Sequence, residues 1–391
     1  MKSTHLFLLS ALSFSQAEAY TLPQHTTKAY DCEECIKLPH ERLQTSWRIT
    51  EIPLNRATPP YQKSYSYNQR ITAKQLRQGV ILSTRAPGAV VRITPLEKKA
   101  MPELELKTPQ NISMTLKEAS ALYRQDEVQD ESLLTAMHHT MMQIKPELGF
   151  GSFVIQSKNA KASEANTYLI NVFDKFSLIY LEVEPDSMHY QYGELFHATI
   201  TLKDYDTTYS TDEISASLIG SDDKVIPLKL TEIKRNQFQA KTLLLSELNA
   251  HGDNWYIETE VVSKQDDGFL RRTARAAFSY SVPSASLISI KKTSSKPLSF
   301  TATINVATAS RYALQSILFN KNAAGEQIPV ETSQSAQWLE PGKQTLKFSF
   351  DNSQQLADDT LSVGYLHLTD YGQLKTVYQY NHPIKLSQLM D

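Results

Sequence analysis

The segment HATITL, residues 197–202, recurs as TATINV, residues 301–306, at an offset of 104 positions. The same offset separates Gly268 in DGFLRRT from Gly372 in YGQLKT, and alternating apolar residues precede both glycines. A third match keeps nearly this spacing and consists of two Ile-Pro pairs, Ile226-Pro227 and Ile328-Pro329. Three matches in one order indicate that the second half of the chain contains two copies of a unit of about 100 residues.

Each copy has the sequence pattern of a β-sandwich. The stretch TEVVSKQDDGFLRRTARAAFSYSV, residues 259–282, alternates in polarity on both sides of Gly268, which can adopt the positive φ of a tight turn. Neither copy contains cysteine, so apolar packing alone must hold it together. Short strands in a unit of about 100 residues are typical of an immunoglobulin-like sandwich. The sequence therefore predicts two tandem sandwiches, residues 183–284 and 285–391, with linkers at Pro185 and Pro283.

The N-terminus has the pattern of a signal peptide. Residues 1–19 contain Lys2, an apolar stretch, and the small-x-small tripeptide Ala17-Glu18-Ala19. The apolar stretch is shorter than the roughly 20 residues that span a bilayer, and no later segment is uniformly apolar over that length. We therefore predict cleavage before Tyr20, export to the periplasm or out of the cell, and no membrane span.

Residues 20–182 predict a module of another kind. The stretch GVILSTRAPGAVVRITP, residues 79–95, reads as a hairpin around Pro87-Gly88. Apolar residues recur at helical spacing in residues 116–123 and 132–142. Strand-like runs then follow at residues 150–157, 166–173 and 177–184. The predicted fold class of the whole chain is mostly β, with an N-terminal α+β module followed by two tandem immunoglobulin-like sandwiches.

The only two cysteines, Cys32 and Cys35, form a CxxC motif close to the predicted mature N-terminus. A redox centre needs a lowered thiol pKa, whereas the flanking acids Asp31, Glu33 and Glu34 raise it. A zinc site is a rival interpretation, in which His25 and His40 would complete the ligand set. Exported thiols tend to be oxidised first, which favours a disulfide over zinc, redox chemistry or free thiols.

Other signatures of chemistry are incomplete. His40-Glu41 begins like a zinc-protease helix, but Gln44 stands where the second histidine belongs. Asp204 and Asp206 lack the later ligands of an EF-hand, and the adjacent pair His138-His139 would point about 100° apart on a helix. We expect no cofactor and no metal. A formal net charge of -2 argues against a nucleic-acid partner, which requires a basic face.

The predicted hairpin around Pro87-Gly88 suggests one candidate site. In its register, Val80, Leu82 and Thr84 would face a core, while Arg85 and Arg92 would share the opposite face, diagonal to each other. Two arginines so placed could hold one carboxylate, phosphate or sulfate group. The alternative is a solvated outer face whose arginines pair with local acids.

Three segments carry a resemblance to a known family: LSTRAPGAVVRITP from residue 82, GFGSFVIQ from residue 149, and YLINVFDKFS from residue 168. With the sandwich-like copies behind them, they resemble an uncharacterised family of exported proteins from Gram-negative bacteria, a domain of unknown function. The resemblance implies an exported three-module protein with a β-rich C-terminal part. It implies no activity and no catalytic residues.

Two classes of function fit these observations. The first is a non-catalytic binding or adhesion-type protein of the envelope or secretome, a monomer whose N-terminal module recognises a protein or glycan ligand. The second is a secreted hydrolase whose active site in the N-terminal module is built from residues distant in sequence. The absence of a recognisable catalytic motif favours the first, although active sites without sequence motifs do occur.

Overall fold

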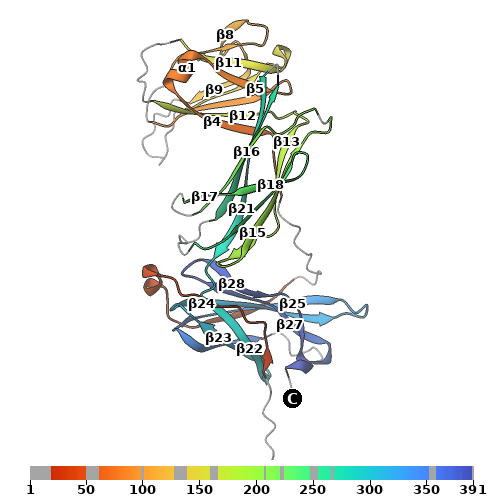
Figure 1. The fold of residues 1–391 in the computed structure, drawn as a ribbon. Coiled ribbons are helices and arrows are strands. Elements are labelled where there is room, and N and C mark those ends of the chain that lie inside the picture. Colours follow the sequence, from red (N-terminus) through yellow and green to blue (C-terminus); the bar gives the residue numbers. More distant parts are fainter. Residues whose placement is uncertain are drawn as a thin grey trace, which may run out of the picture. The chain divides into compact units, whose positions relative to one another are not determined.

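The computed structural model describes residues 19–49, 61–97, 101–126, 139–158, 166–206, 208–220, 224–246, 254–265, 268–351 and 358–389 (Figure 1). Residues 1–18 of the predicted signal peptide lie outside this range. The described chain is almost entirely antiparallel β-structure, which confirms the mostly β prediction. None of its helices is both long enough and apolar enough to cross a membrane.

The N-terminal module consists of two facing sheets. In spatial order the five-stranded sheet contains β4 (Ser66–Thr72), β12 (Thr167–Phe173), β6 (Val90–Pro95), β10 (His139–Ile144) and β9 (Ser120–Asp126). The four-stranded sheet contains β5 (Val80–Thr84), β11 (Gly151–Ser157), β7 (Leu104–Lys107) and β8 (Ser113–Thr115). Alternate residues of both sheets point inward and form one apolar core, with Leu82, Val91 and Phe153 at its centre.

The single α-helix of the described module, α1 (Ala73–Gln78), begins at a capping box formed by Thr72 and Gln75. The short 3-10 turn η2 (Pro146–Leu148) follows β10. The helices predicted at residues 116–123 and 132–142 are wrong wherever the structure describes them, because Ser120–Asp126 and His139–Ile144 are strands. Inward Thr140, Met142 and Ile144 show a period of two, which the helix-compatible spacing of Leu133, Met137 and Met141 had hidden.

The predicted hairpin around Pro87-Gly88 is also wrong. β5 pairs with β11, whereas β6 pairs with β12 and β10, so the chain crosses from one sheet to the other between them. Val80, Leu82 and Thr84, which were predicted to face a core, are nevertheless buried, and so are Ala89, Val91 and Ile93 after the crossover. A crossover between facing sheets directs both strands toward the same core as a hairpin would, so the polarity pattern cannot distinguish the two.

The central sandwich has the same two-layer construction. One sheet contains β18 (Lys229–Lys234), β19 (Gln237–Leu243), β15 (Leu195–Lys203), β13 (Tyr180–Pro185) and β3 (Gln62–Ser64). The other contains β14 (His189–Gln191), β21 (Gly268–Ser281), β20 (Trp255–Gln265), β16 (Glu213–Ile219) and β17 (Val225–Pro227). Because β13 pairs with β15 over its whole length, this sandwich includes residues before position 183, and Pro185 ends a strand instead of lying in a linker.

The C-terminal sandwich contains strands from both ends of the chain. One sheet has β1 (Tyr20–Thr21), β22 (Ala285–Ser295), β23 (Leu298–Val306) and β26 (Gly342–Phe350). The other has β2 (Leu43–Arg48), β25 (Gln327–Leu339), β24 (Ser310–Lys321), β27 (Leu361–Asp370) and β28 (Lys375–Tyr380), and β29 (Ile384–Lys385) pairs with β27. The 3-10 turns described in it are η1 (Glu33–Lys37), η5 (Asp358–Thr360) and η6 (Leu386–Gln388). The predicted module 20–182 therefore includes a segment, β1 to β2, that pairs with the C-terminal sandwich.

The repeat seen in the sequence corresponds to equivalent strands. HATITL lies in β15 and TATINV in β23, and both strands occupy the second position of a three-strand series, β13-β15-β19 and β22-β23-β26. Gly268 and Gly372 follow the equivalent strands β20 and β27. The N-terminal module and central sandwich belong to one compact unit, and the C-terminal sandwich with residues 19–49 belongs to a second.

Candidate functional site

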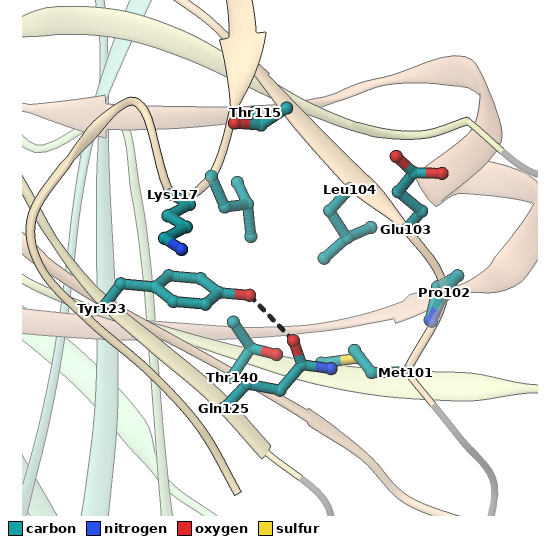
Figure 2. A pocket seen from close by; sticks show the side chains of 10 residues that line it. Met101, Pro102, Glu103, Leu104, Thr115, Lys117, Tyr123, Gln125 and Thr140 are labelled. Carbon is teal, nitrogen blue, oxygen red and sulfur yellow. Dashed lines mark hydrogen bonds between the residues drawn. The ribbon is translucent and has the colours of Figure 1, made fainter.

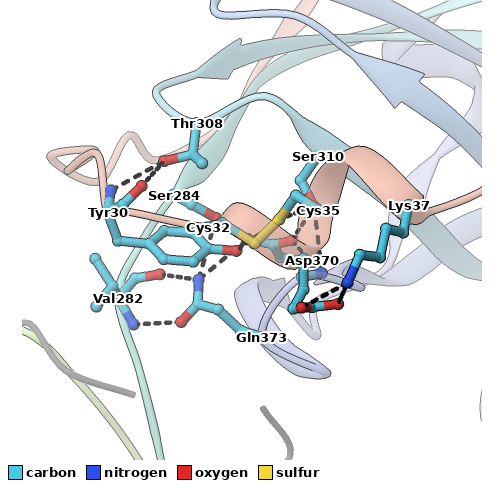
Figure 3. Close-up of a disulfide and its surroundings, with 12 residues drawn as sticks. Tyr30, Cys32, Cys35, Lys37, Val282, Ser284, Thr308, Ser310, Asp370 and Gln373 are labelled. Carbon is cyan, nitrogen blue, oxygen red and sulfur yellow. Dashed lines mark hydrogen bonds and ion pairs between the residues drawn. A yellow bond between two sulfur atoms is a disulfide. The ribbon is translucent and has the colours of Figure 1, made fainter. Parts of the chain in front are cut away.

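In the structure a disulfide joins Cys32 and Cys35 across the start of η1. Cys35 is 1% exposed, and its Sγ lies 3.5 Å from the Ser310 hydroxyl oxygen and 3.6 Å from the Tyr30 hydroxyl oxygen (Figure 3). The loop also packs on Gly372, where an added Cβ would overlap both Cys35 Sγ and Tyr30 Oη. The disulfide therefore holds a loop against the C-terminal sandwich, which is the arrangement of a structural staple.

The histidines of the rival zinc interpretation make other contacts. The His25 ring meets Tyr378 edge-on at 5.2 Å between centroids, and the His40 ring stacks on Trp338 at 4.1 Å. Among the described residues no three histidine, cysteine, aspartate or glutamate side chains form a group that could hold a metal ion. The structure thus does not bring His25 and His40 together with the two cysteines.

Asp370 forms a buried polar network behind the disulfide (Figure 3). Its carboxylate accepts hydrogen bonds from the Tyr30 hydroxyl at 2.9 Å and from the Ser284 and Ser310 hydroxyls at 2.6 Å each. The Gly372 amide and the Gln373 side chain also donate to it. Burial and the charge of Asp370 both raise the pKa of Tyr30, so this hydroxyl remains a donor. The network holds the N-terminal loop and Ser284 against the C-terminal sandwich.

The two candidate anion-binding arginines are separated. Arg85 lies in the crossover after β5, where its guanidinium stacks over the Tyr209 ring at 5.0 Å and its backbone amide donates to Asp174 at 2.8 Å. Arg92 is exposed on β6, between Asn171 of β12 and Met141 of β10. Because β5 and β6 belong to different sheets, the predicted diagonal pair does not form.

The remaining sequence candidates have structural roles or fall outside the description. Asp204 accepts hydrogen bonds from the amides of Asp206 and Tyr209 and so closes a turn. His139 begins β10 and is half-buried, whereas His138 lies outside the described residues.

A buried ion pair, which the sequence analysis did not find, holds the linker between the N-terminal module and the central sandwich. Arg272 Nη2 lies 2.8 Å from Asp174 Oδ2, and the two side chains are 1% and 0% exposed. Arg272 also donates to the Ser177 hydroxyl and the Ile179 carbonyl. The Asp174 carboxylate in turn accepts hydrogen bonds from the backbone amides of Arg85 and Ala86. One feature of the sequence could have indicated this ion pair. Arg272 is a charged residue at an inward position of the alternating strand β21.

The N-terminal module contains a cavity of about 320 Å³ between the edges of its two sheets (Figure 2). β9 and β10 supply one wall and β7 and β8 the other. The polar groups that line it are an acid, an ammonium, a phenol, an amide and two hydroxyls: Glu103, Lys117, Tyr123, Gln125, Thr115 and Thr140. This volume is at the lower end of the roughly 300–1,000 Å³ typical of small-molecule sites.

Strand alternation directs Tyr123 and Gln125 into this cavity, while Leu122 and Arg124 point away from it. The Tyr123 hydroxyl donates to the Gln125 side-chain carbonyl at 2.9 Å, and Gln125 faces Thr140 across the β9–β10 pair. Partial burial raises the pKa of Tyr123, which keeps the phenol protonated. The wall thus combines an aromatic ring with neutral donors and acceptors. Sequence reasoning missed it because residues 116–123 were interpreted as a helix.

Comparison with known proteins gives the family. Three models of the domain of unknown function DUF4785 match the chain: the N-terminal domain at residues 34–174, the central domain at 177–281 and the C-terminal domain at 284–387. A crystal structure of a DUF4785 family protein from Legionella pneumophila is 54% identical, covers 94% of this chain and 99% of its own, and has a TM-score of 0.83. The chain belongs to the DUF4785 family.

Two other comparisons add nothing to this. A solved tetra-tandem repeat from the extending region of a large adhesion protein is 13% identical over 77% of this chain and 68% of its own, with a TM-score of 0.20. That score is too low to indicate a common fold. A search of the curated proteins found no match.

Proposed function

We propose that this DUF4785 protein is an exported, non-catalytic binding protein of adhesion type, whose specificity lies in its N-terminal module. The observation that supports the proposal most directly is the cavity lined by Tyr123, Gln125 and Thr140. It is concave, it lies at the edge of the two sheets, and its polar groups come from β8, β9, β10 and the segments next to β7 and β8. These are the properties of a site that binds a small polar group.

The chemistry of the lining favours a neutral, hydroxyl-rich ligand such as the terminal sugar of a glycan. The Tyr123 ring offers an apolar face, and Gln125 and Thr140 offer both donors and acceptors. Glu103 and Lys117, which lie on opposite sides of the cavity in Figure 2, can accept and donate further hydrogen bonds. A sugar ring carries several hydroxyl groups, and these need both hydrogen-bond donors and hydrogen-bond acceptors from the protein.

The rest of the chain fits a role in presenting the module. The central and C-terminal sandwiches contain the equivalent strand series β13-β15-β19 and β22-β23-β26, as expected of repeated immunoglobulin-like spacers. The Cys32–Cys35 disulfide is typical of proteins in oxidising compartments, which supports export to the periplasm or beyond.

A hydrolase with its active site in the same cavity receives less support. Hydrolysis of a glycosidic bond normally uses two carboxylates on opposite sides of the bond. Glu103 is the single carboxylate among the described residues that line the cavity, and histidine is absent from that lining.

The proposal can be tested with the full mature chain and a panel of common mono- and disaccharides, using ligand-observed NMR. Binding should be detected for at least one sugar, and Tyr123→Ala should weaken it about tenfold or more, since stacking and a hydrogen bond are both lost. Leu122→Ala is the matched control, because the neighbouring side chain points away from the cavity. Absence of binding across the panel would contradict the glycan ligand, and release of hydrolysis products would favour the enzyme.

A further inference from the structure

The outer face of the five-stranded sheet in the N-terminal module carries three arginines, and we propose that this face binds an acidic polysaccharide. We call it the arginine face and define it by Arg70 on β4, Arg92 on β6 and Arg124 on β9. It is separate from the cavity, which opens on the inner side of the same sheet. The inference therefore goes beyond the proposed function.

Strand register places these side chains on one face. Arg92 lies opposite Asn171 of β12 on one side and opposite Met141 of β10 on the other. Met141 in turn lies opposite Arg124. Their sequence neighbours Val91, Ile93, Ile170, Val172 and Met142 are buried in the core. Because neighbours in a strand point to opposite faces, the row of Asn171, Arg92, Met141 and Arg124 points outward.

Positively charged side chains predominate in the described part of this face. Arg70, Arg92 and Arg124 are all exposed, and their side chains alternate with amides and with exposed apolar groups. Asp126 stands at the corner of the face opposite His139, and the carboxylate of Glu97 at the rim accepts hydrogen bonds from Thr167. Among the described residues, the guanidinium groups of Arg70 and Arg92 have no carboxylate as an ion-pair partner.

The spacing of the arginines distinguishes between anionic partners. Arg92 and Arg124 lie on strands that flank β10, and Arg70 and Arg92 lie on strands that flank β12. With strands about 4.8 Å apart, each pair is separated by about 10 Å across the sheet, and Arg70 is also displaced from Arg92 by two residues, or about 7 Å, along the strands. An extended acidic peptide would repeat its same-side charges every 7 Å or so, about two residues. A polysaccharide with an acid group on every second sugar repeats its charge at a longer interval, close to that of the arginines.

The groups between the arginines also fit a sugar chain. Asn68, Asn171 and Gln143 lie on this face and can donate to and accept from hydroxyl groups. Met141 is 38% exposed and Phe173 is 40% exposed, and such apolar groups can cover the C–H faces of sugar rings. Each arginine can form paired hydrogen bonds to a carboxylate.

Hyaluronan, which carries a carboxylate on alternate sugars, is the probe for the test. The full mature chain should bind it at low salt by affinity electrophoresis or calorimetry, and binding should weaken as salt increases. Arg92→Gln should lower the affinity about tenfold, and the triple variant Arg70→Gln, Arg92→Gln, Arg124→Gln should abolish binding. Arg48→Gln, an exposed arginine on the C-terminal sandwich, is the matched control and should bind like the wild type. Each variant should also unfold at the wild-type temperature, because the replaced side chains are exposed.

Several results would overturn the inference. These are failure of the wild type to bind hyaluronan, equal binding by the triple variant, an equal loss in Arg48→Gln, and equal binding of neutral dextran. Binding to anionic phospholipid vesicles with none to hyaluronan would identify a membrane surface instead and would also overturn it. Tyr123→Ala separates this inference from the proposed function, because it should leave hyaluronan binding unchanged while it weakens binding in the cavity.

Discussion

The central and C-terminal sandwiches share equivalent strands and differ at one equivalent position, the glycine that follows β20 in the first and β27 in the second. In the central sandwich Gly268, the first residue of β21, lies against Ser152 of β11, and Arg272 further along β21 forms the buried ion pair with Asp174. In the C-terminal sandwich the turn before β28 presents Gly372 to the Cys32–Cys35 loop, and Asp370 just before it gathers hydroxyl and amide donors. One fold thus uses the same position to hold two different preceding segments.

The two copies therefore place equivalent strands alike, but each holds its preceding segment by a different interaction. The central copy uses an ion pair, and the C-terminal copy uses a carboxylate with neutral donors. A buried carboxylate can be stabilised by a cation or by several neutral hydrogen-bond donors. The two arrangements differ in how much stabilisation is lost when one partner is removed. Removal of Arg272 leaves Asp174 as a buried charge without its cation, whereas loss of one donor leaves Asp370 with several others. The two attachments should therefore differ in their sensitivity to single substitutions.

The largest effect is expected from Arg272→Met. Without its guanidinium the Asp174 carboxylate remains buried and unpaired, so the free energy of unfolding should fall by about 4 kcal/mol. Urea denaturation followed by fluorescence would measure it. Arg275→Gln, an exposed change three residues along the same strand, should cost less than about 1 kcal/mol. Equal effects of the two variants would contradict a special role for the ion pair.

The next effect is expected from Gly372→Ala. The new methyl group would overlap Cys35 Sγ and Tyr30 Oη, so the loop must move away at a cost of about 2–3 kcal/mol. Calorimetric melting would detect the loss. The cost should shrink in a background with Cys32→Ala and Cys35→Ala, because the colliding sulfur is gone. Gly268→Ala should cost less, since the hydroxyl of Ser152 can rotate away, although its φ of +140° adds some strain.

Tyr30→Phe should cost about 2 kcal/mol, because it deletes a hydrogen bond to a buried carboxylate. It should also change the response to alkali. The pKa of Tyr30 is raised in the folded protein, first by burial and then by Asp370, so its contribution is intact below the unfolded pKa of about 10 and is lost as pH rises above it. Unfolding measured from pH 8 to 11 should show a steeper decline for wild type than for Tyr30→Phe. Tyr61→Phe, an exposed change, should leave the decline as it is.

The smallest effect is expected from opening the disulfide. A bridge that closes so short a loop contributes at most about 2 kcal/mol by restricting the unfolded chain. Melting with and without reductant would measure this contribution. The native protein should resist alkylation by iodoacetamide until it is reduced, since both sulfurs are in the disulfide. Alkylation of the untreated protein would contradict the staple.

The fold could be predicted from sequence only where polarity patterns are unambiguous. The repeat and the inward set of β5 and β6 were correct, because period-two alternation marks the buried face of a strand in any partner arrangement. The helix predicted over residues 132–142 failed at β10, because apolar residues four apart are compatible with both a helix and a strand. Pairing partners were also not predictable: β1 and β2 join strands more than 200 positions away.

The sequence by itself determined that the chain is mostly β, that its second half is duplicated, and that its two cysteines are close enough to bond. These features depend on local periodicity, short spacing and self-similarity, which the primary structure contains in full. Only the tertiary structure decided that Arg92 joins Arg70 and Arg124 instead of Arg85, and that Arg272 meets Asp174. Sheet neighbours and buried charge pairs are selected by the packing of distant segments against one another, and that selection leaves no spacing in the sequence from which it could be read.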